Sequence, residues 1–197
     1  MKIEHIESKI LEFKEKMKDY SRLVETITAF SNTQGGTIVI GIRDSDREII
    51  GLSDADIIKY HQEIPQVAAD AISPQIAVDL YEQNMGGKTC LTIRVFPGPQ
   101  KPYFIKKTGY PAGIFLRFGS HNRRADPYAV EEFSRSKTGV RFEQSPCPRI
   151  SYADLSSDLL AIIFKECNET ILIGAGLGVT EVSGRTIPNV AGALLFY

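Results

Sequence analysis

Lysine and arginine side chains gather in the segment after residue 100, where aromatic side chains lie between them. The cations are Lys106, Lys107, Arg117, Arg123 and Arg124, and the aromatic residues are Tyr103, Phe104, Tyr110 and Phe115. An arginine guanidinium presents a planar fork of donors that matches two phosphate oxygens, and a lysine ammonium binds phosphate as a point charge. Exposed rings can stack on unpaired bases. This combination predicts a surface that binds nucleic acid.

Two details refine this surface. The alternation of side chains along a strand favours burial of Phe104 and Phe115 over stacking on bases. A turn is expected at residues 119–122, and its backbone N–H groups could also hold a phosphate. The predicted nucleic-acid-binding residues are therefore Lys106, Lys107, Arg117, Ser120, His121, Asn122, Arg123 and Arg124.

The charge of the chain is unevenly distributed, although the net charge of −1 favours no particular partner. Residues 1–100 carry 11 Lys and Arg against 15 Asp and Glu, and residues 142–197 carry 3 against 6. Residues 101–141 carry 9 against 3, which gives this segment a charge of +6. A local basic surface attracts polyanions. The alternative is that folding scatters these charges over different faces.

Composition excludes several classes of protein. No apolar stretch is long enough to span a membrane, and the first residues lack the apolar run of a secretory signal. Cys90, Cys147 and Cys167 are widely spaced without a CxxC pair, which argues against a zinc site or a disulfide framework. We therefore expect a cytoplasmic protein without a membrane partner.

The first half of the chain predicts alternating strands and helices. A short strand is expected at Glu12–Lys14, and an amphipathic helix at 22–32 with Ser21 as its N-cap. The apolar, β-branched run at 37–42 predicts a buried strand. A second helix is expected from Asp54 to about Ala71, with a break or kink at Pro65.

The second half begins with a predicted hairpin of residues 76–81 and 88–96, whose second arm alternates between two faces. Strands at 102–105 and 113–118 are expected to pair across Gly109, followed by a helix at 127–135. A linker is expected near residues 141–148. Beyond it, an amphipathic helix at 154–167 and a strand-like apolar run at 193–197 are predicted, and such a strand needs a partner beyond the chain.

These elements predict an α+β fold, in which helices flank a mixed β-sheet and a short, partly helical appendage comes last. The predicted domains are residues 1–141, which bind nucleic acid, and residues 142–197, which hold the linker and the start of a truncated C-terminal region. The glycines at 35–36 and at 174, 176 and 178 are not nucleotide loops, because GxxxxGK[ST] and a βαβ context are both missing.

Three motifs occur together: Glu-x4-Glu-Phe-Lys at 7–14, Ala-Phe-Ser-Asn-Thr-Gln-Gly-Gly at 29–36 running into Ile-Val-Ile-Gly-Ile-Arg-Asp at 38–44, and Gly-Ser-His-Asn-Arg-Arg-Ala at 119–125. In this combination residues 5–135 resemble the Schlafen AlbA_2 domain, also called the divergent AAA-4 domain. The resemblance implies an α+β fold and association with nucleic acid. The tail, from Thr186 to Tyr197, is more loosely similar to the region after this domain in bacterial RecG-related proteins and transcriptional regulators. That similarity implies an absent C-terminal half, ATPase-like with a winged-helix element, where ATP would bind.

The resemblance also assigns a possible catalytic set. In some eukaryotic Schlafen proteins a Glu/Glu/Asp set binds a divalent metal and cuts RNA, and the matching residues here are Glu7, Glu12 and Asp44, with Lys14 nearby. Carboxylate oxygens suit Mg²⁺ or Mn²⁺, which activates water, and Lys14 could stabilise the developing charge. Alternatively, Glu12 pairs with Lys14 or Arg43 at the surface, and Asp44 starts a turn.

Three functions remain as hypotheses. The leading one is a nucleic-acid-binding module, with DNA preferred over RNA, of a transcriptional regulator. The second is a metal-dependent nuclease built on Glu7, Glu12, Lys14 and Asp44. The third is a protein-interaction or oligomerisation module, in which an exposed sheet edge pairs two chains into a homodimer.

Overall fold

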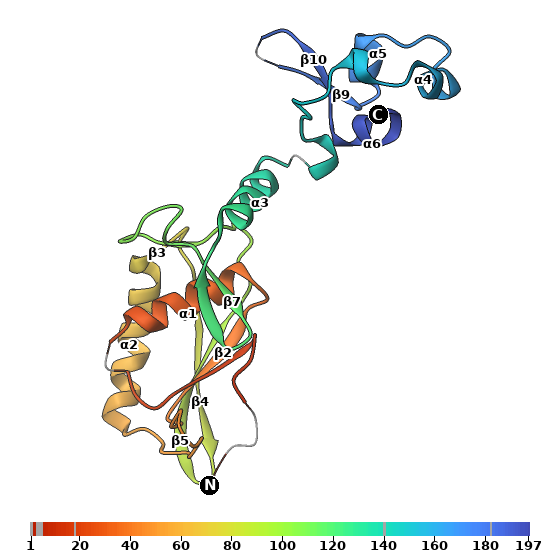
Figure 1. Cartoon of the computed structure of the whole chain (residues 1–197). Coiled ribbons are helices and arrows are strands. Elements are labelled where there is room, and N and C mark those ends of the chain that lie inside the picture. The colour runs from red at the N-terminus through yellow and green to blue at the C-terminus, as the bar shows by residue number, and fades with distance from the viewer. Residues whose placement is uncertain (1, 3–5, 18, 140, 182) are drawn as a thin grey trace. The chain divides into compact units, whose positions relative to one another are not determined.

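The computed structural model describes residues 2, 6–17, 19–139, 141–181 and 183–197, and the chain divides into two compact units (Figure 1). The first unit is Met1–Phe133 and the second is Ser134–Tyr197. Helix α3, Pro127–Thr138, contains this division, and the domain boundary expected after residue 141 stays a prediction. Among the helices of the described residues, none has the length and apolar character needed to cross a membrane.

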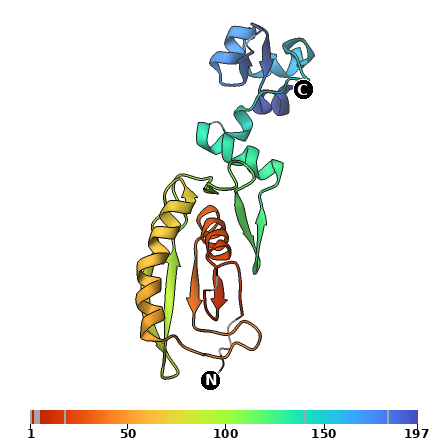
Figure 2. The same ribbon diagram turned by 90° about the vertical axis from the view of Figure 1, so that its left-hand side faces the viewer.

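A four-stranded sheet forms the centre of the first unit. Its strands are β1 (Leu11–Lys14), β2 (Gly36–Ile40), β4 (Asp79–Met85) and β5 (Lys88–Val95), in the order β1-β2-β5-β4. β1 runs parallel to β2, and the other neighbours are antiparallel. Helices α1 (Ser21–Asn32) and α2 (Asp54–Ala71) lie against one face (Figure 2). This confirms the predicted α+β class with a mixed sheet and flanking helices.

Side-chain alternation divides the sheet into two unlike faces. On β5, Leu91, Ile93 and Val95 join the core beneath α1 and α2, whereas Cys90 packs in a smaller cluster on the other side. On β2, Ile38 faces the helices and Val39 the opposite side. The period of two in a strand enforces this division. Within the described part of the first unit, helices α1 and α2 cover one face and leave the other open.

Helix α1 has the amphipathic pattern that the sequence predicted, but its cap is different. The N-cap position is Tyr20, whose side chain makes no capping hydrogen bond. Ser21 is the first helical residue, and its backbone N–H and hydroxyl both donate to the Asp19 carboxylate. The predicted N-cap is therefore wrong, because the side chain of Asp19 engages the serine that would have accepted from the helix.

Helix α2 runs without interruption through Pro65, so the predicted break is wrong. The proline removes one backbone donor from the helix. However, Tyr60, Ile64 and Ala68 are buried against the main core, and this packing holds the helix on both sides of the proline. The start of α2 is capped by Ser53, whose hydroxyl accepts from the N–H of Asp56.

Two small sheets come after the central one. β3 (Ile72–Ser73) pairs with β6 (Phe104–Ile105), and β7 (Phe115–Phe118) pairs with β8 (His121–Arg124). The predicted pairing across Gly109 is reduced to one bridge, between Phe104 and Ile114. The turn predicted at 119–122 is the two-residue loop Gly119–Ser120, and Gly119 supplies the positive φ of 59° that such a loop needs.

The second unit is small and has its own apolar core of Leu155, Leu160, Leu172 and Phe196. Its elements are the 3₁₀ turns at Phe142–Gln144 and Tyr152–Asp154, the helices α4 (Ser157–Ile163), α5 (Glu169–Gly174) and α6 (Val190–Phe196), and the strands β9 (Gly178–Thr180) and β10 (Thr186–Pro188).

Two predictions in this unit are wrong. The helix expected at 154–167 is only α4, because Ser156 caps a new start after the 3₁₀ turn and the helix ends at Ile163. The strand-like run at 193–197 lies largely in α6, because Asn189 caps a helix by accepting from the N–H of Gly192. A short apolar run cannot be assigned to strand or helix from periodicity alone.

Candidate nucleic-acid interface

Asn32, the last residue of α1, fixes the position of the segments that carry the cations. Its side-chain nitrogen donates to the carbonyl oxygens of Tyr103 at 2.8 Å and Phe115 at 3.0 Å, and its side-chain oxygen accepts from the N–H of Tyr103 at 2.7 Å. The residue is buried, so these bonds are shielded from water. Sequence reasoning missed this role, and the only available signal was an amide at the end of an apolar helix.

The two glycines after Asn32 allow close packing at the same place. A Cβ atom on Gly35 would lie 2.6 Å from the carbonyl oxygen of Val95, and one on Gly36 would lie 2.7 Å from the ring of Phe30. Gly35 also has a φ of +77°, which other residues rarely adopt. The motif at residues 29–36 therefore builds the scaffold of the first unit.

Arg117 lies beneath the surface. Its guanidinium pairs with the Glu12 carboxylate at 2.6 Å, donates to the carbonyl oxygen of Ser8 at 3.2 Å and to the side chain of Asn122 at 2.9 Å, and stacks over Phe30. The side chain is only 1% exposed. A phosphate group outside the protein cannot reach a guanidinium in this position, so the candidate interface does not include Arg117.

The hairpin β7–β8 displays the other cations. Arg123 faces Leu116 across the hairpin and His121 faces Phe118, so these side chains share one face because directly opposed residues lie on the same side. His121, Arg123 and Phe118 are exposed. Arg124 lies on the opposite face and is also exposed.

The remaining predicted residues differ in exposure. Lys106 and Lys107 are exposed in the turn after β6, where the Lys106 ammonium donates to the carbonyl oxygen of Ala69 near the end of α2. Ser120 and Asn122 are half-buried, and the Asn122 amide donates to the Thr26 hydroxyl. Asn122 thus helps to dock the hairpin on α1.

The lysine turn and the hairpin belong to neighbouring segments of the first unit. The N–H of Ile105 donates to the carbonyl oxygen of Gly113 at 3.0 Å, and the N–H of Ala125 donates to that of Ile114 at 2.9 Å. These bonds place the segments 104–105, 113–118 and 121–125 side by side. The exposed cations Lys106, Lys107, Arg123 and Arg124 therefore lie on adjoining segments, with Arg123 and Arg124 on opposite faces of the hairpin.

The carboxylates predicted to bind metal lie near one another but are already engaged. Glu12 is buried and binds Arg117 through one oxygen and Lys14 through the other. Glu7 accepts from the N–H of Phe13 at 2.9 Å. Over the residues that the structure describes, no three His, Cys, Asp or Glu side chains form a group that could hold a metal ion. The set does not fit a metal in this arrangement, and the nuclease hypothesis stays a prediction.

The charges of these acidic groups nevertheless shift one another's pKa values. Burial raises the pKa of Glu7, and the negative charges of Glu12 and Asp44 raise it further. Burial also raises the pKa of Asp44, while the positive charge of Lys14 opposes this rise. Lys14 and Asp44 both line a cleft of about 480 Å³, together with Glu15, Lys16, Met17, Asp19 and Arg22.

Comparison with known proteins identifies the family of the first unit. The family model described as Schlafen, AlbA_2 matches residues 7–126, which is more than half of the chain. The chain belongs to the Schlafen AlbA_2 family. The matched residues of this Schlafen AlbA_2 domain begin at Glu7 and end just after β8, so they contain the central sheet, α1, α2 and the basic hairpin. The resemblance inferred from the three motifs is confirmed.

Two solved structures are similar to this Schlafen AlbA_2 protein. One is the DIP2311 protein from Corynebacterium diphtheriae, with 22% identity over 95% of this chain and a TM-score of 0.48; the chain spans 41% of that protein's length. The other is the N-terminal domain of an ATP-dependent DNA helicase RecG-related protein from Nitrosomonas europaea. It has 26% identity over 62% of this chain and 86% of its own, with a TM-score of 0.48. No curated protein matches the chain.

Proposed function

We propose that the first unit binds DNA through the exposed cations of the β7–β8 hairpin and the turn after β6, as the DNA-binding module of a transcriptional regulator. The observation that carries the proposal is the exposure of Arg123 and Arg124 on a hairpin docked against α1. No acidic residue occurs between residues 101 and 125, so the local potential is not cancelled within this segment.

The shape of the hairpin supports DNA over RNA. The major groove of B-form DNA admits a two-stranded β-ribbon, and β7–β8 is such a ribbon with a two-residue loop. The major groove of A-form RNA is too narrow for side chains to read. His121 and Arg123 share one face of this ribbon and could contact base edges, while the lysines contact phosphates.

A salt titration tests the proposal. The full chain would be titrated against a fluorescently labelled DNA duplex at several salt concentrations, with anisotropy as the readout. If about four to six phosphates of the duplex are neutralised, the logarithm of the association constant should fall with the logarithm of salt concentration at a slope of about −3.6 to −5.4. Absence of binding at low salt, or binding that salt leaves unchanged, would refute the proposal.

The regulatory role requires preference among DNA sequences. Selection from a pool of random duplexes, followed by competition against unselected duplex, measures this preference. Enrichment of one sequence that binds at least tenfold more tightly would support a transcriptional regulator. Equal affinity for all sequences would leave DNA binding in place and remove the regulatory role.

A metal-dependent nuclease is the second candidate, and one observation favours it. The raised pKa values of Glu7 and Asp44 occur around Lys14, and perturbed pKa values gather at functional sites. The engagement of Glu12 with Arg117 and Lys14 opposes it, because a ligand must have free oxygen lone pairs.

A further inference from the structure

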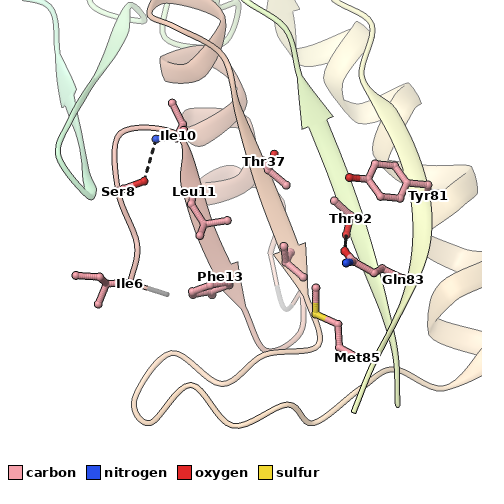
Figure 3. A pocket seen from close by; sticks show the side chains of 11 residues that line it. Ile6, Ser8, Ile10, Leu11, Phe13, Thr37, Tyr81, Gln83, Met85 and Thr92 are labelled. Carbon is pink, nitrogen blue, oxygen red and sulfur yellow. Dashed lines mark hydrogen bonds between the residues drawn. The ribbon is translucent and has the colours of Figure 1, made fainter. Parts of the chain in front are cut away.

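The open face of the central sheet contains a hollow of about 450 Å³ that lies outside the proposed DNA-binding surface (Figure 3). Phe13, Val39 and Thr92 from three adjacent strands line it, together with Tyr81 and Met85 of β4. Ile6, Ser8, Ile10 and Leu11 border it as well. The helices lie behind the sheet in this view, so the hollow opens away from them.

The lining of this hollow selects for an uncharged ligand with polar edges. Among the described residues no charged side chain lines it, whereas two aromatic rings and a methionine do. The Gln83 side-chain oxygen accepts from the Thr92 hydroxyl at 3.3 Å, and the Gln83 amide nitrogen makes no hydrogen bond to any described residue. Thr37 and Tyr81 add hydroxyl groups. A flat heteroaromatic ring matches such a lining, because rings and thioether pack on its faces while amide and hydroxyl groups meet its edges.

A second, smaller hollow adjoins the first and contains a cation. It has a volume of about 250 Å³ and shares Ile10 and Thr37 with the larger hollow. Of the described residues that line it, Arg94 alone is charged, and its guanidinium lies 4.9 Å from the centre of the Phe96 ring. Arg94 is exposed and has no carboxylate within salt-bridge distance among the described residues, although Asp79 lies opposite it in the sheet register.

The spacing of the two hollows matches a nucleotide. Thr92 in the neutral hollow and Arg94 in the cationic one are two residues apart on β5, which corresponds to about 6.8 Å along a strand. A sugar ring joins a base to its phosphate over a comparable length. We propose that the open sheet face binds one unpaired nucleotide, with the base in the neutral hollow beside Tyr81 and the phosphate at Arg94.

The proposal rests on the proposed function in one respect: the nucleotide belongs to the DNA that the hairpin holds. Bases in a duplex stay stacked within it, and extruding one costs the free energy of its pairing and stacking. A single-stranded tail presents its bases without that cost, so the preferred partner is a duplex that continues into a single strand. An acyl chain would leave the polar groups of Gln83 and Thr37 without hydrogen-bond partners, and it offers no anionic group to the guanidinium of Arg94.

The experiment compares two DNA ligands with the full chain. One is a blunt duplex, and the other is the same duplex with a six-nucleotide single-stranded tail that contains 2-aminopurine, whose fluorescence falls when it stacks on an aromatic ring. We expect the tailed duplex to bind about tenfold more tightly than the blunt one, with quenching of the tail. In Tyr81→Ala and Arg94→Gln the ratio of the two affinities should fall towards one, and Tyr81→Ala should also restore the fluorescence.

Matched controls come from outside the site. Tyr128→Ala removes an exposed tyrosine from α3, and Lys59→Gln removes an exposed cation from α2 on the covered side of the sheet. Both should retain the full preference for the tail. Thermal melting of each variant identifies any that fails to fold, and the two site variants act independently, so loss of one leaves the other as a test.

A third ligand distinguishes the sources of the nucleotide. Free deoxyadenosine monophosphate, titrated alone, should bind more weakly than the tail, and Arg94→Gln should weaken it further. Equal affinity for tailed and blunt duplexes, or quenching that survives Tyr81→Ala, would overturn the inference while the DNA-binding proposal stands. If neither duplex binds, the proposed function fails. The titration with the monophosphate then tests the nucleotide site by itself. Binding that both Tyr81→Ala and Arg94→Gln weaken supports the site, and absence of binding overturns it.

Discussion

The guanidinium of Arg117 and the carboxylate of Glu12 form a buried ion pair, with 2.6 Å between nitrogen and oxygen, that joins residues 105 positions apart in the chain. It connects β7 to β1 and therefore attaches the basic hairpin to the central sheet. The same carboxylate binds Lys14, so one glutamate compensates two cations. Glu12 and Arg117, both candidates for function in the sequence, are bound to each other inside the fold.

Removing one partner of this pair should be costly. A buried charge left without its counter-charge typically lowers the free energy of unfolding by about 3–5 kcal/mol. We expect Arg117→Met to show a loss of this size in urea denaturation monitored by circular dichroism. The double variant Glu12→Gln with Arg117→Met should recover part of the loss, because the buried carboxylate charge is then removed and only the partly exposed Lys14 loses its partner. A loss below about 1 kcal/mol in the single variant would contradict the burial of the pair.

Reversing the charge of Arg123 and Arg124 should abolish binding to DNA. Arg123→Glu with Arg124→Glu places two carboxylates on the hairpin that faces the DNA polyanion, and repulsion replaces attraction. We expect at least a hundredfold loss of affinity in the anisotropy titration at low salt. The matched control, Lys59→Glu with Lys165→Glu, changes the net charge equally at exposed positions elsewhere and should bind nearly as well as the native chain. Equal losses in both variants would mean that only the net charge matters.

Glu7 should make stability dependent on pH. Burial raises the pKa of Glu7 above its value in the unfolded chain, so the native state holds the proton more tightly. The free energy of unfolding therefore falls as pH rises from the pKa of the unfolded chain through the raised pKa of the native state. Glu7→Gln keeps an oxygen acceptor for the N–H of Phe13 and removes the charge. We expect this variant to be more stable than the native chain at pH 7 and to lose that advantage below about pH 4.3, the ordinary glutamate pKa. Denaturant midpoints from pH 3.5 to 8 measure the difference, and parallel curves would show the prediction to be wrong.

The nuclease hypothesis has a direct assay. The full chain would be incubated with structured RNA and with single-stranded DNA in the presence of Mn²⁺ or Mg²⁺. Loss of cleavage in Glu12→Ala would be ambiguous, because that change also strips Arg117 of its partner. Asp44→Asn is the sharper variant, since the amide keeps the size of the side chain and the change removes only its charge. Cleavage that disappears in Asp44→Asn would support the enzyme, and intact substrates with both metals would reject it.

The predicted homodimer has a physical route in β4. This strand pairs only with β5, so among the described strands of the first unit its outer edge is unpaired. An unpaired edge can join the same strand of a second chain, although Asp79 and Glu82 on β4 weaken such pairing. We expect light scattering to give twice the mass of one chain at high concentration and the monomer mass on dilution. A monomer at every concentration would contradict dimerisation.

Local patterns were sufficient for the elements of the central sheet. The alternation along residues 88–96 predicted two faces on β5, and Leu91, Ile93 and Val95 occupy the one that faces the core. The spacing of Leu23, Ile27 and Phe30 predicted the buried face of α1 in the same way. The strand alternation and the helical spacing each extend over several residues, and each depends only on the core layer between the sheet and the helices.

Contacts between distant residues could not be predicted. Arg117 was expected at the surface because of its residue type, yet alternation places it on the inner side of β7 with Phe115, and its partner lies far away in the sequence. The partner of β7 was also ambiguous, because glycines at both 109 and 119 allow a hairpin turn. The hollow beside Tyr81 could not be predicted from the sequence, because the apolar and neutral polar residues that line it come from separate strands and form no motif.

The three hydrogen bonds of Asn32 complicate the interpretation of any mutational scan. Asn32→Asp would take away both donors that hold Tyr103 and Phe115, and would displace the arginines without altering a single solvent-facing group. A map of variants that lose binding would then mark a buried residue at the end of α1 as though it contacted the DNA. Footprinting or crosslinking from the DNA side, which reports proximity instead of phenotype, is the method that separates anchors from contacts in this protein.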